Sequence, residues 1–204
     1  FNTSGVLILL IFVAAAILLI ITPGPGVLSL AGVGSAFGFR AGLKYFIGLF
    51  VGNNLVGVFV ISGVGALVLA DPVTRTVLLV LSSIYLIYLA STIALSGSNI
   101  GFKGYTHKPG IKSGVLLQII NPKAYVVNST MYSGFLLFEN AYLLEVIIKV
   151  LIVNTIWIPV HFLWLYIGVF IKRLDLSRSI QCIINYFMAT AMVLVVVLSV
   201  IAAL

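Results

Sequence analysis

The sequence predicts an all-α integral membrane protein with six transmembrane helices, and three observations predict it. Of the 204 residues, 62% are apolar and only 7% are charged. The mean hydropathy of +1.29 lies far above the range of water-soluble domains. The apolar residues form long segments that lack the in-out alternation of barrel strands, which span a bilayer with about ten residues. Helices are therefore favoured over a β-barrel.

The six predicted spans cover residues 5–28, 46–70, 77–95, 114–138, 146–171 and 180–204. Each is long enough for the roughly 20 apolar residues that one crossing requires. We expect the first segment to remain a spanning helix rather than a signal peptide, because no Lys or Arg precedes Arg40. Residues 1–204 are therefore expected to form a single transmembrane domain. The single Cys182 excludes an internal disulfide or a cysteine-only metal site, and no cofactor is expected.

The basic residues predict how the chain is oriented. The net charge is +7 and there are 11 Lys and Arg residues. The first, third and fifth linkers hold Arg40, Lys44, Lys103, Lys108, Lys112, Lys172, Arg173 and Arg178. Arg75, in the second linker, and Lys149, near the start of the fifth predicted span, face the opposite side. Because short basic loops stay in the cytoplasm, both termini are expected outside, and membrane lipids rather than nucleic acid are the expected counter-charge.

The two halves of the chain match each other in order. Four of six positions are identical between residues 18–23 and residues 117–122, at an offset of 99. The other matches are Asn53 and Asn54 with Asn154, and residues 74–76 with residues 177–179. These matches predict two three-helix repeats, about 1–98 and 99–204, and an odd number of crossings inverts the second copy. Inverted repeats are typical of secondary transporters; duplication kept only for packing is the alternative.

Helices one and four are predicted to be broken. The first carries Thr22-Pro23-Gly24-Pro25-Gly26 and the fourth carries Asn121-Pro122. Each proline removes a backbone donor, and the glycines free the chain to leave the helix. An unsatisfied carbonyl is costly in hydrocarbon, so a break is tolerated where it packs in protein or lines a wet cavity. A plain proline kink is the alternative.

The broken helices and the intramembrane polar side chains define a candidate substrate site. A broken helix presents free N–H groups at one end and free carbonyls at the other, and a zwitterion needs both. Lys123 either adds a charge for a carboxylate or extends to the membrane interface. The candidate binding residues are Thr22, Pro23, Gly24, Pro25, Gly26, Asn53, Asn54, Tyr85, Gln118, Asn121, Pro122, Lys123 and Asn154. Hydrogen bonding between helices is the alternative role for the polar ones.

The sequence offers few groups for proton coupling. All four carboxylates fall at span ends, and they are Asp71, Glu139, Glu145 and Asp175. Besides Lys123, the only ionisable group well inside a span is His161. An imidazole changes charge near neutral pH, so His161 is the candidate coupling residue, with a structural histidine as the alternative.

Five short motifs carry a resemblance to a known family. They are Thr22-Pro23-Gly24-Pro25, Arg40-Ala41-Gly42-Leu43, Gly48-x-x-x-Gly52, Tyr85-Leu86 with Tyr88-Leu89, and Asn121-Pro122-Lys123-Ala124. In these the chain resembles the LysE/RhtB family of bacterial amino-acid exporters over nearly its whole length. The resemblance implies efflux of amino acids or related small metabolites across the inner membrane, driven by the proton gradient, in a homodimer.

Three positions depart from that family's pattern. Gly26 stands where the family usually has Asn or Asp, and Asn53 stands where it usually has Asp. Asn154 lies near a position that often carries an acid. Coupling through those acids is therefore not expected here, and neither is a cationic substrate.

The sequence analysis favours a secondary transporter of amino acids or related metabolites. One alternative is a carrier of another small solute or ion on the same scaffold, since a fold does not fix a substrate. Another is a non-transporting subunit of a membrane assembly. We do not expect an enzyme, because the sequence has no His-Glu-x-x-His motif, no paired membrane aspartates and no persuasive nucleophile and base.

Overall fold

The computed structural model describes residues 3–65, 70–95, 108–138, 141–174 and 177–201, and in this part of the chain all regular structure is helical. The helices are α1 (Thr3–Ile21), α2 (Pro25–Phe37), α3 (Phe39–Ile61), α5 (Pro72–Leu95), α6 (Ile111–Ile120), α7 (Pro122–Ser133), α8 (Tyr142–Arg173) and α9 (Arg178–Ile201). The predicted all-α class is confirmed.

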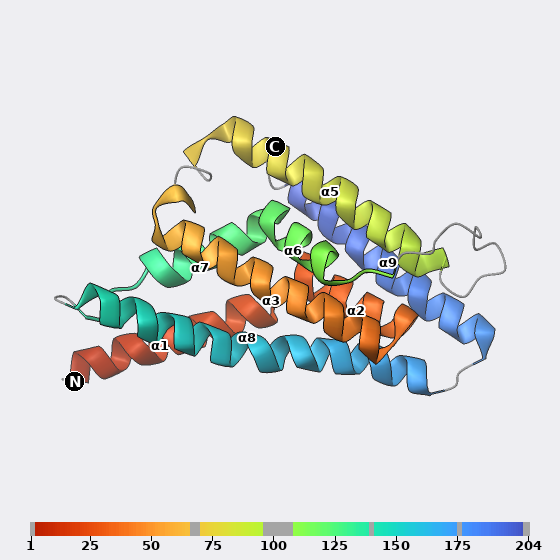
Figure 1. Cartoon of the computed structure of the whole chain (residues 1–204), viewed down its shortest axis with the longest axis horizontal. Helices are drawn as coiled ribbons and strands as arrows, with labels where there is room; N and C mark the ends of the chain where they lie inside the picture. Colours follow the sequence, from red (N-terminus) through yellow and green to blue (C-terminus); the bar gives the residue numbers. More distant parts are fainter. Residues whose placement is uncertain (1–2, 66–69, 96–107, 139–140, 175–176, 202–204) are drawn as a thin grey trace.

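The helices form an elongated bundle in which α8 runs along most of the long axis (Figure 1). The most extensive helix pairs are α3 with α6, α2 with α8, and α5 with α9. Fully buried leucines fill the centre where α2, α3, α6 and α8 meet, namely Leu30, Leu49, Leu117 and Leu165. This packing brings segments from both halves of the chain together at the middle of the molecule.

Local sequence signals explain where several helices begin. Proline occupies the first position of α2, α5 and α7 as Pro25, Pro72 and Pro122, where its missing N–H costs nothing. Asp71 caps α5 by accepting a hydrogen bond from the Thr74 backbone N–H at 2.8 Å. The hydrogen bonds from the Thr74 hydroxyl and backbone also hold the pKa of the Asp71 carboxyl below its usual range.

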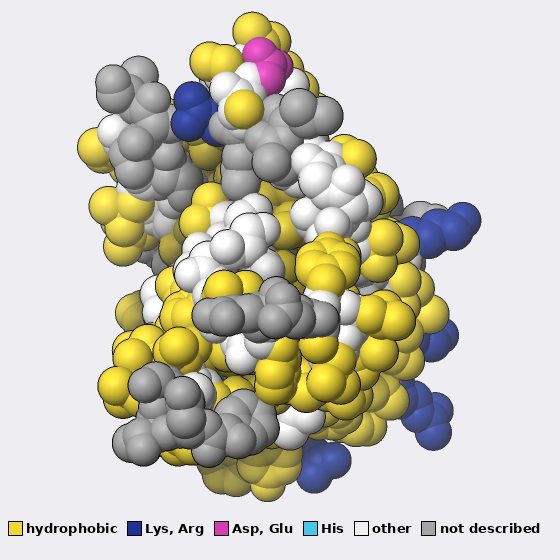
Figure 2. Space-filling model, turned by 90° about the vertical axis from the view of Figure 1, so that its left-hand side faces the viewer, with side chains coloured by type: hydrophobic (Ala, Val, Ile, Leu, Met, Phe, Trp, Pro, Cys, Tyr) yellow, Lys and Arg dark blue, Asp and Glu magenta, His cyan; other side chains and the backbone are white. Residues whose placement is uncertain are grey.

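Three helices are each long and apolar enough to cross a membrane, and these are α3, α5 and α8. In the described residues α1 and α2 together meet the same test as one span bent by 49°. Shorter apolar helices cover Ile111–Ile120 and Cys182–Leu198. The end at which α1 and α8 begin is largely hydrophobic on its surface (Figure 2). The chain is thus a helical multi-pass membrane protein, and the count of six crossings stays a prediction.

The first span extends further than its predicted end at residue 28. Helix α2 continues to Phe37, so the break lies inside the span rather than near its end. The small residues of α2 lower the hydropathy of its sequence, which is why its end at Phe37 was not predicted. They also let α2 approach α8 closely. A Cβ on Gly34 would lie 3.0 Å from the Leu165 carbonyl oxygen, and one on Gly168 would collide with the carbonyl of Ala31.

One end of the molecule is basic. Arg40 and Lys44 lie in the first turns of α3 rather than in a linker, and Lys172 and Arg173 lie in the last turn of α8. Lys172 Nζ donates to the Ala36 carbonyl at the end of α2, at 2.9 Å. These four residues define what we call the basic end, at the right of Figure 1.

Two sequence-based interpretations of charged residues were wrong. Lys149 was counted as a topology signal on the side opposite the basic linkers, and Glu145 was placed at a span end where no buried acid was expected. Both lie on α8 and are buried, with exposed fractions of 1% and 6%. They form an ion pair one helical turn apart. The helix begins earlier than its hydropathy suggests and is covered by the segment that follows α7, so these positions are inside the protein.

Candidate substrate-binding site

The first break separates α1 from α2 at residues 22–24. The last hydrogen bond of α1 runs from the Thr22 N–H to the Leu18 carbonyl at 3.2 Å. The next helical bond runs from the Leu28 N–H to the Gly24 carbonyl at 3.1 Å, after Pro25 has started α2. The carbonyl of Thr22 is therefore left at the C-terminal end of α1, which carries a partial negative charge.

The second break separates α6 from α7 at Asn121. Pro122 cannot donate to the Gln118 carbonyl, which accepts instead from the Asn121 N–H at 3.3 Å. The Asn121 side chain accepts from the Lys123 N–H at 3.1 Å and so caps α7. Both predicted breaks are confirmed, and each combines a proline at the first position of the new helix with a locally extended residue before it.

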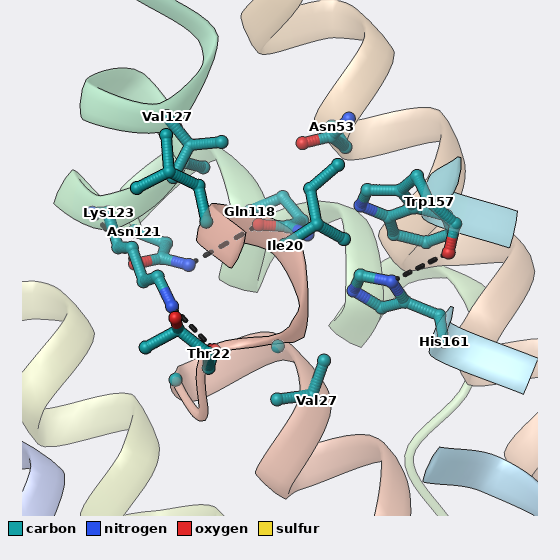
Figure 3. A pocket seen from close by; sticks show the side chains of 14 residues that line it. Ile20, Thr22, Val27, Asn53, Gln118, Asn121, Lys123, Val127, Trp157 and His161 are labelled. Atoms are coloured by element: carbon teal, nitrogen blue, oxygen red, sulfur yellow. Dashed lines mark hydrogen bonds between the residues drawn. The ribbon is translucent and has the colours of Figure 1, made fainter. Parts of the chain in front are cut away.

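Lys123 joins the two breaks. Its Nζ donates to the Thr22 carbonyl at 2.7 Å, as Figure 3 shows. The side chain therefore runs toward the first break, in the other half of the chain. Gly24 leaves room for this path, because a Cβ there would lie 2.8 Å from Lys123 Cδ and 2.9 Å from its Nζ and would make the end of the lysine shift.

A small cavity of about 50 Å³, which we call the inner cavity, lies beside this bond (Figure 3). It holds a few ordered water molecules at most and is far smaller than the roughly 300 Å³ of a small-molecule site. Eight predicted residues line it: Thr22, Gly24, Gly26, Asn53, Gln118, Asn121, Lys123 and His161.

A second cavity of about 340 Å³, the side cavity, lies on the other side of the breaks toward α5 and α9. Four residues line both cavities, namely Thr22, Gly24, Asn121 and Lys123. The Lys123–Thr22 bond is thus part of their common wall. The predicted residues Pro23, Pro25 and Pro122 line the side cavity, together with Ser82, Ser83 and apolar side chains of α5 and α9.

His161 is fixed by its neighbour Trp157. Its Nδ1 lies 2.9 Å from the Trp157 carbonyl, and the two rings stack with centroids 3.5 Å apart. A carbonyl only accepts, so Nδ1 carries a hydrogen and the lone pair of the neutral ring is at Nε2. A Cβ on Gly26 would lie 3.8 Å from this Nε2 and 3.5 Å from Gln118 Nε2. The missing side chain at position 26 therefore leaves space beside the imidazole.

Amide groups complete the wall of the inner cavity. Asn121 Nδ2 donates to Gln118 Oε1 at 3.4 Å. Asn53 is buried, and its Oδ1 accepts from Asn128 Nδ2 at 3.1 Å. Among the residues that the structure describes, no group of three or more His, Cys, Asp and Glu side chains is placed to hold a metal ion.

Three predicted site residues lie outside both cavities. Asn54 and Asn154 bond to each other, with Nδ2 to Oδ1 distances of 3.2 and 3.0 Å. Tyr85 donates its hydroxyl to the Ser113 carbonyl at 3.2 Å. These contacts between helices match the alternative role given to intramembrane polar groups.

The sequence analysis missed two contributors to the site. Trp157 stacks on His161 and lines the inner cavity, and its position one turn before that histidine was the available signal. Asn128 holds Asn53 in place from α7, and its position almost two turns after Pro122 placed it near the second break. The apolar wall of the side cavity carried no sequence signal.

Two interrupted helices that meet at a polar cavity inside a helical membrane protein define the architecture of secondary transporters. The chain belongs to the LysE type translocator family, whose model matches residues 17–202.

Several related proteins carry the name "Leucine efflux protein". The one from Klebsiella pneumoniae subsp. pneumoniae is 27% identical over 141 residues, covering 67% of this chain and 66% of the relative. The one from Enterobacter sp. is 27% identical over 143 residues, covering 67% of each. The one from Salmonella typhimurium is 24% identical over 143 residues, covering 67% and 66%. The chain thus matches about two thirds of their length, and no solved structure matches it.

Proposed function

We propose that this protein is a secondary transporter that exports amino acids or related small metabolites across the bacterial inner membrane. The observation that carries the proposal is the bond between Lys123 and the Thr22 carbonyl, which joins the two helix breaks. A zwitterion can compete for both partners of this bond, since a carboxylate matches the ammonium and an ammonium matches the carbonyl. The family membership supports the same class of function.

The side cavity supports an aliphatic amino acid as substrate. Its volume of about 340 Å³ is in the range of small-molecule sites. Leu79, Leu86 and Val196 contribute apolar wall, while Lys123 and Ser82 lie at its polar side. In the proposed complex the substrate carboxylate binds Lys123 and the side chain contacts α5 and α9. The name of the relatives, leucine efflux protein, agrees with such a substrate.

We further propose that the two halves are related by inversion. In a pair of repeats related by a two-fold axis, residues near the axis contact their own counterparts. Gly24 and Lys123 are in contact and stand 99 positions apart, as the repeat alignment requires. Asn54 and Asn154 are bonded at a separation of 100. The axis would pass between the breaks, where alternating access needs the site to lie.

We also propose how transport is driven, how the protein is oriented in the membrane and how it assembles. Transport is coupled to the proton gradient, with His161 as the titrating group, because its Nε2 lies at the inner cavity. The basic end faces the cytoplasm and both termini face the periplasm, since short basic segments are retained inside. The protein works as a homodimer within the lipid bilayer.

The test is transport by the purified protein in liposomes. Vesicles loaded with unlabelled leucine should accumulate external radiolabelled leucine by exchange, and Lys123→Met should reduce this about tenfold or more. Lys112→Met is the matched control, because Lys112 is exposed at the start of α6.

Three outcomes would contradict the proposal. Folded protein that exchanges no amino acid would favour a non-transporting subunit. Exchange of a different solute or an ion alone would favour another carrier on this scaffold. Chemical conversion of the labelled compound would indicate an enzyme.

A further inference from the structure

The buried ion pair on α8 lies away from the helix breaks and has a built set of oxygen partners. Lys149 Nζ lies 2.5 Å from Glu145 Oε1. It also donates to the Tyr132 carbonyl at 3.1 Å and to the Phe135 carbonyl at 2.5 Å. With an exposed fraction of 1%, the ammonium is removed from water and held by three oxygens.

The carbonyls come from a helix terminus. Tyr132 lies in the last turn of α7, which ends at Ser133, and Phe135 lies just beyond it. Carbonyls at this position lack intrahelical donors and carry the partial negative charge of the helix end. Together with one carboxylate they form a compact set of hard oxygen ligands.

Two other lysines also bind carbonyls at helix ends, and both differ from Lys149. Lys123 binds the Thr22 carbonyl and Lys172 binds the Ala36 carbonyl, each through one hydrogen bond that the structure describes. Neither is fully buried. Among these three lysines, only Lys149 binds one carboxylate and two carbonyls. These oxygens compensate its positive charge where water does not reach it.

We propose that Tyr132, Phe135 and Glu145 form a monovalent-cation site and that the Lys149 ammonium occupies it as a tethered cation. Three donors on an ammonium match three oxygen acceptors. One carboxylate balances one positive charge, which fits an alkali cation rather than a divalent one. Carbonyls at the C-terminal ends of helices hold Na⁺ in broken-helix transporters, which shows that backbone oxygens of this kind can bind an alkali cation.

The site pins the segment after α7 onto α8. The second oxygen of Glu145 accepts from the Phe138 N–H at 3.0 Å. The Phe135 ring packs edge-on against Phe12 of α1, with centroids 5.3 Å apart. Residues 134–138 are therefore held between α1 and α8 at the end of the molecule that faces the viewer in Figure 2. A tethered cation cannot dissociate, so the attachment of residues 134–138 to α8 does not depend on the external salt.

A neighbouring cavity would give a free cation access to the site. It has a volume of about 360 Å³, and its walls include Glu145, Tyr142 and the 132–138 segment. Shortening Lys149 would thus leave a negative oxygen cluster next to an open cavity. Such a cluster should take up Na⁺ from solution.

The experiment compares thermal unfolding of detergent-purified variants in NaCl and in choline chloride at equal ionic strength, with purification carried through in each salt. Wild type should respond equally to both salts. Lys149→Ala should unfold at a lower temperature in choline chloride and regain about 5 °C at saturating Na⁺, because a ligand that binds only the folded state stabilises it.

Two control variants separate a cation site from general packing. Lys149→Met fills the space with an apolar chain and should lose stability equally in both salts. Glu145→Gln combined with Lys149→Ala removes the carboxylate and should also show no preference for Na⁺. The proposal is wrong if Lys149→Ala responds to the two salts alike, and equally wrong if that variant aggregates to the same extent in both.

Discussion

Asn54 and Asn154 exchange two amide hydrogen bonds between α3 and α8, with Nδ2 to Oδ1 distances of 3.2 and 3.0 Å. Each amide also donates to a carbonyl one turn earlier on its own helix, to Phe50 at 2.9 Å and to Val150 at 3.0 Å. The two residues are 100 positions apart and stand at matching places in the two halves. A polar pair of this kind fixes the register of two helices that otherwise pack through apolar side chains.

We predict that the two asparagines are energetically coupled. Asn54→Leu or Asn154→Leu alone leaves one amide without its partner and should cost about 1–2 kcal/mol. The double variant should cost less than the sum, with a coupling energy of roughly 0.6–1.7 kcal/mol. Unfolding of the four proteins in detergent measures this cycle. Strictly additive losses would mean that the pair does not act as a unit.

Gly24→Ala should impair transport without touching a polar group. The added Cβ would lie within 3 Å of Lys123 Cδ and Nζ, so the end of the lysine side chain must shift from its present position at the Thr22 carbonyl. Leucine exchange in liposomes should fall, but by less than the roughly tenfold expected for Lys123→Met. Gly110→Ala is the control, since a Cβ at that position would meet no other atom within 4 Å. Equal activity of both alanine variants would remove the Lys123–Thr22 bond from the mechanism.

The breaks themselves can be tested by restoring a donor. Pro122→Ala supplies an N–H that can reach the Gln118 carbonyl, and Pro23→Ala supplies one that can reach the Leu19 carbonyl. Both variants should fold at least as well as wild type while transport falls by about an order of magnitude. The measurement pairs a melting curve with the exchange assay. Normal transport by both would show that the breaks are only kinks.

Much of the fold was predictable because membrane burial leaves strong local signals. The apolar runs predicted the helices, and two prolines beside glycine or asparagine predicted both breaks, since backbone chemistry acts within a few residues. The end of α2 at Phe37 was missed because its glycines and serines lower the hydropathy of the segment. Their role is tertiary: Gly32 packs on Ile93 of α5, and Gly34 packs on Leu165 of α8.

The site was predicted in part for the same reason. Polar residues inside apolar spans were rare enough to be noticed, and six of them line the inner cavity. Whether a given amide faces the cavity or another helix depends on helix rotation, which short polar motifs do not specify; Asn53 and Asn54 are neighbours with different partners. Lys149 was counted as a topology signal because nothing in its neighbourhood in the sequence shows that the segment after α7 buries it.

The orientation makes a prediction that needs no purified protein. A reporter that is active only in the periplasm should work when fused after Leu204 and stay silent when inserted in the linker between α5 and α6. The reason is the retention of the basic end in the cytoplasm. A cytoplasmic reporter at the same two positions serves as the control and should give the reverse pattern. Activity of the periplasmic reporter in the linker would overturn the orientation.

His161 allows the coupling proposal to be separated from a structural role. Its Nδ1–H donates to the Trp157 carbonyl, and its Nε2 lies at the inner cavity. An Asn or Gln side chain at this position replaces one of these two nitrogens with a neutral amide group. His161→Asn keeps a donor near Nδ1, and His161→Gln reaches toward Nε2, but neither can titrate. Because an imidazole changes charge near neutral pH, both variants should lose accumulation driven by an imposed pH gradient while leucine exchange continues. If the only role of the residue is its bond to Trp157, His161→Asn should instead keep gradient-driven accumulation. That result would reject histidine coupling and favour a carrier that is driven by the substrate gradient or by another ion.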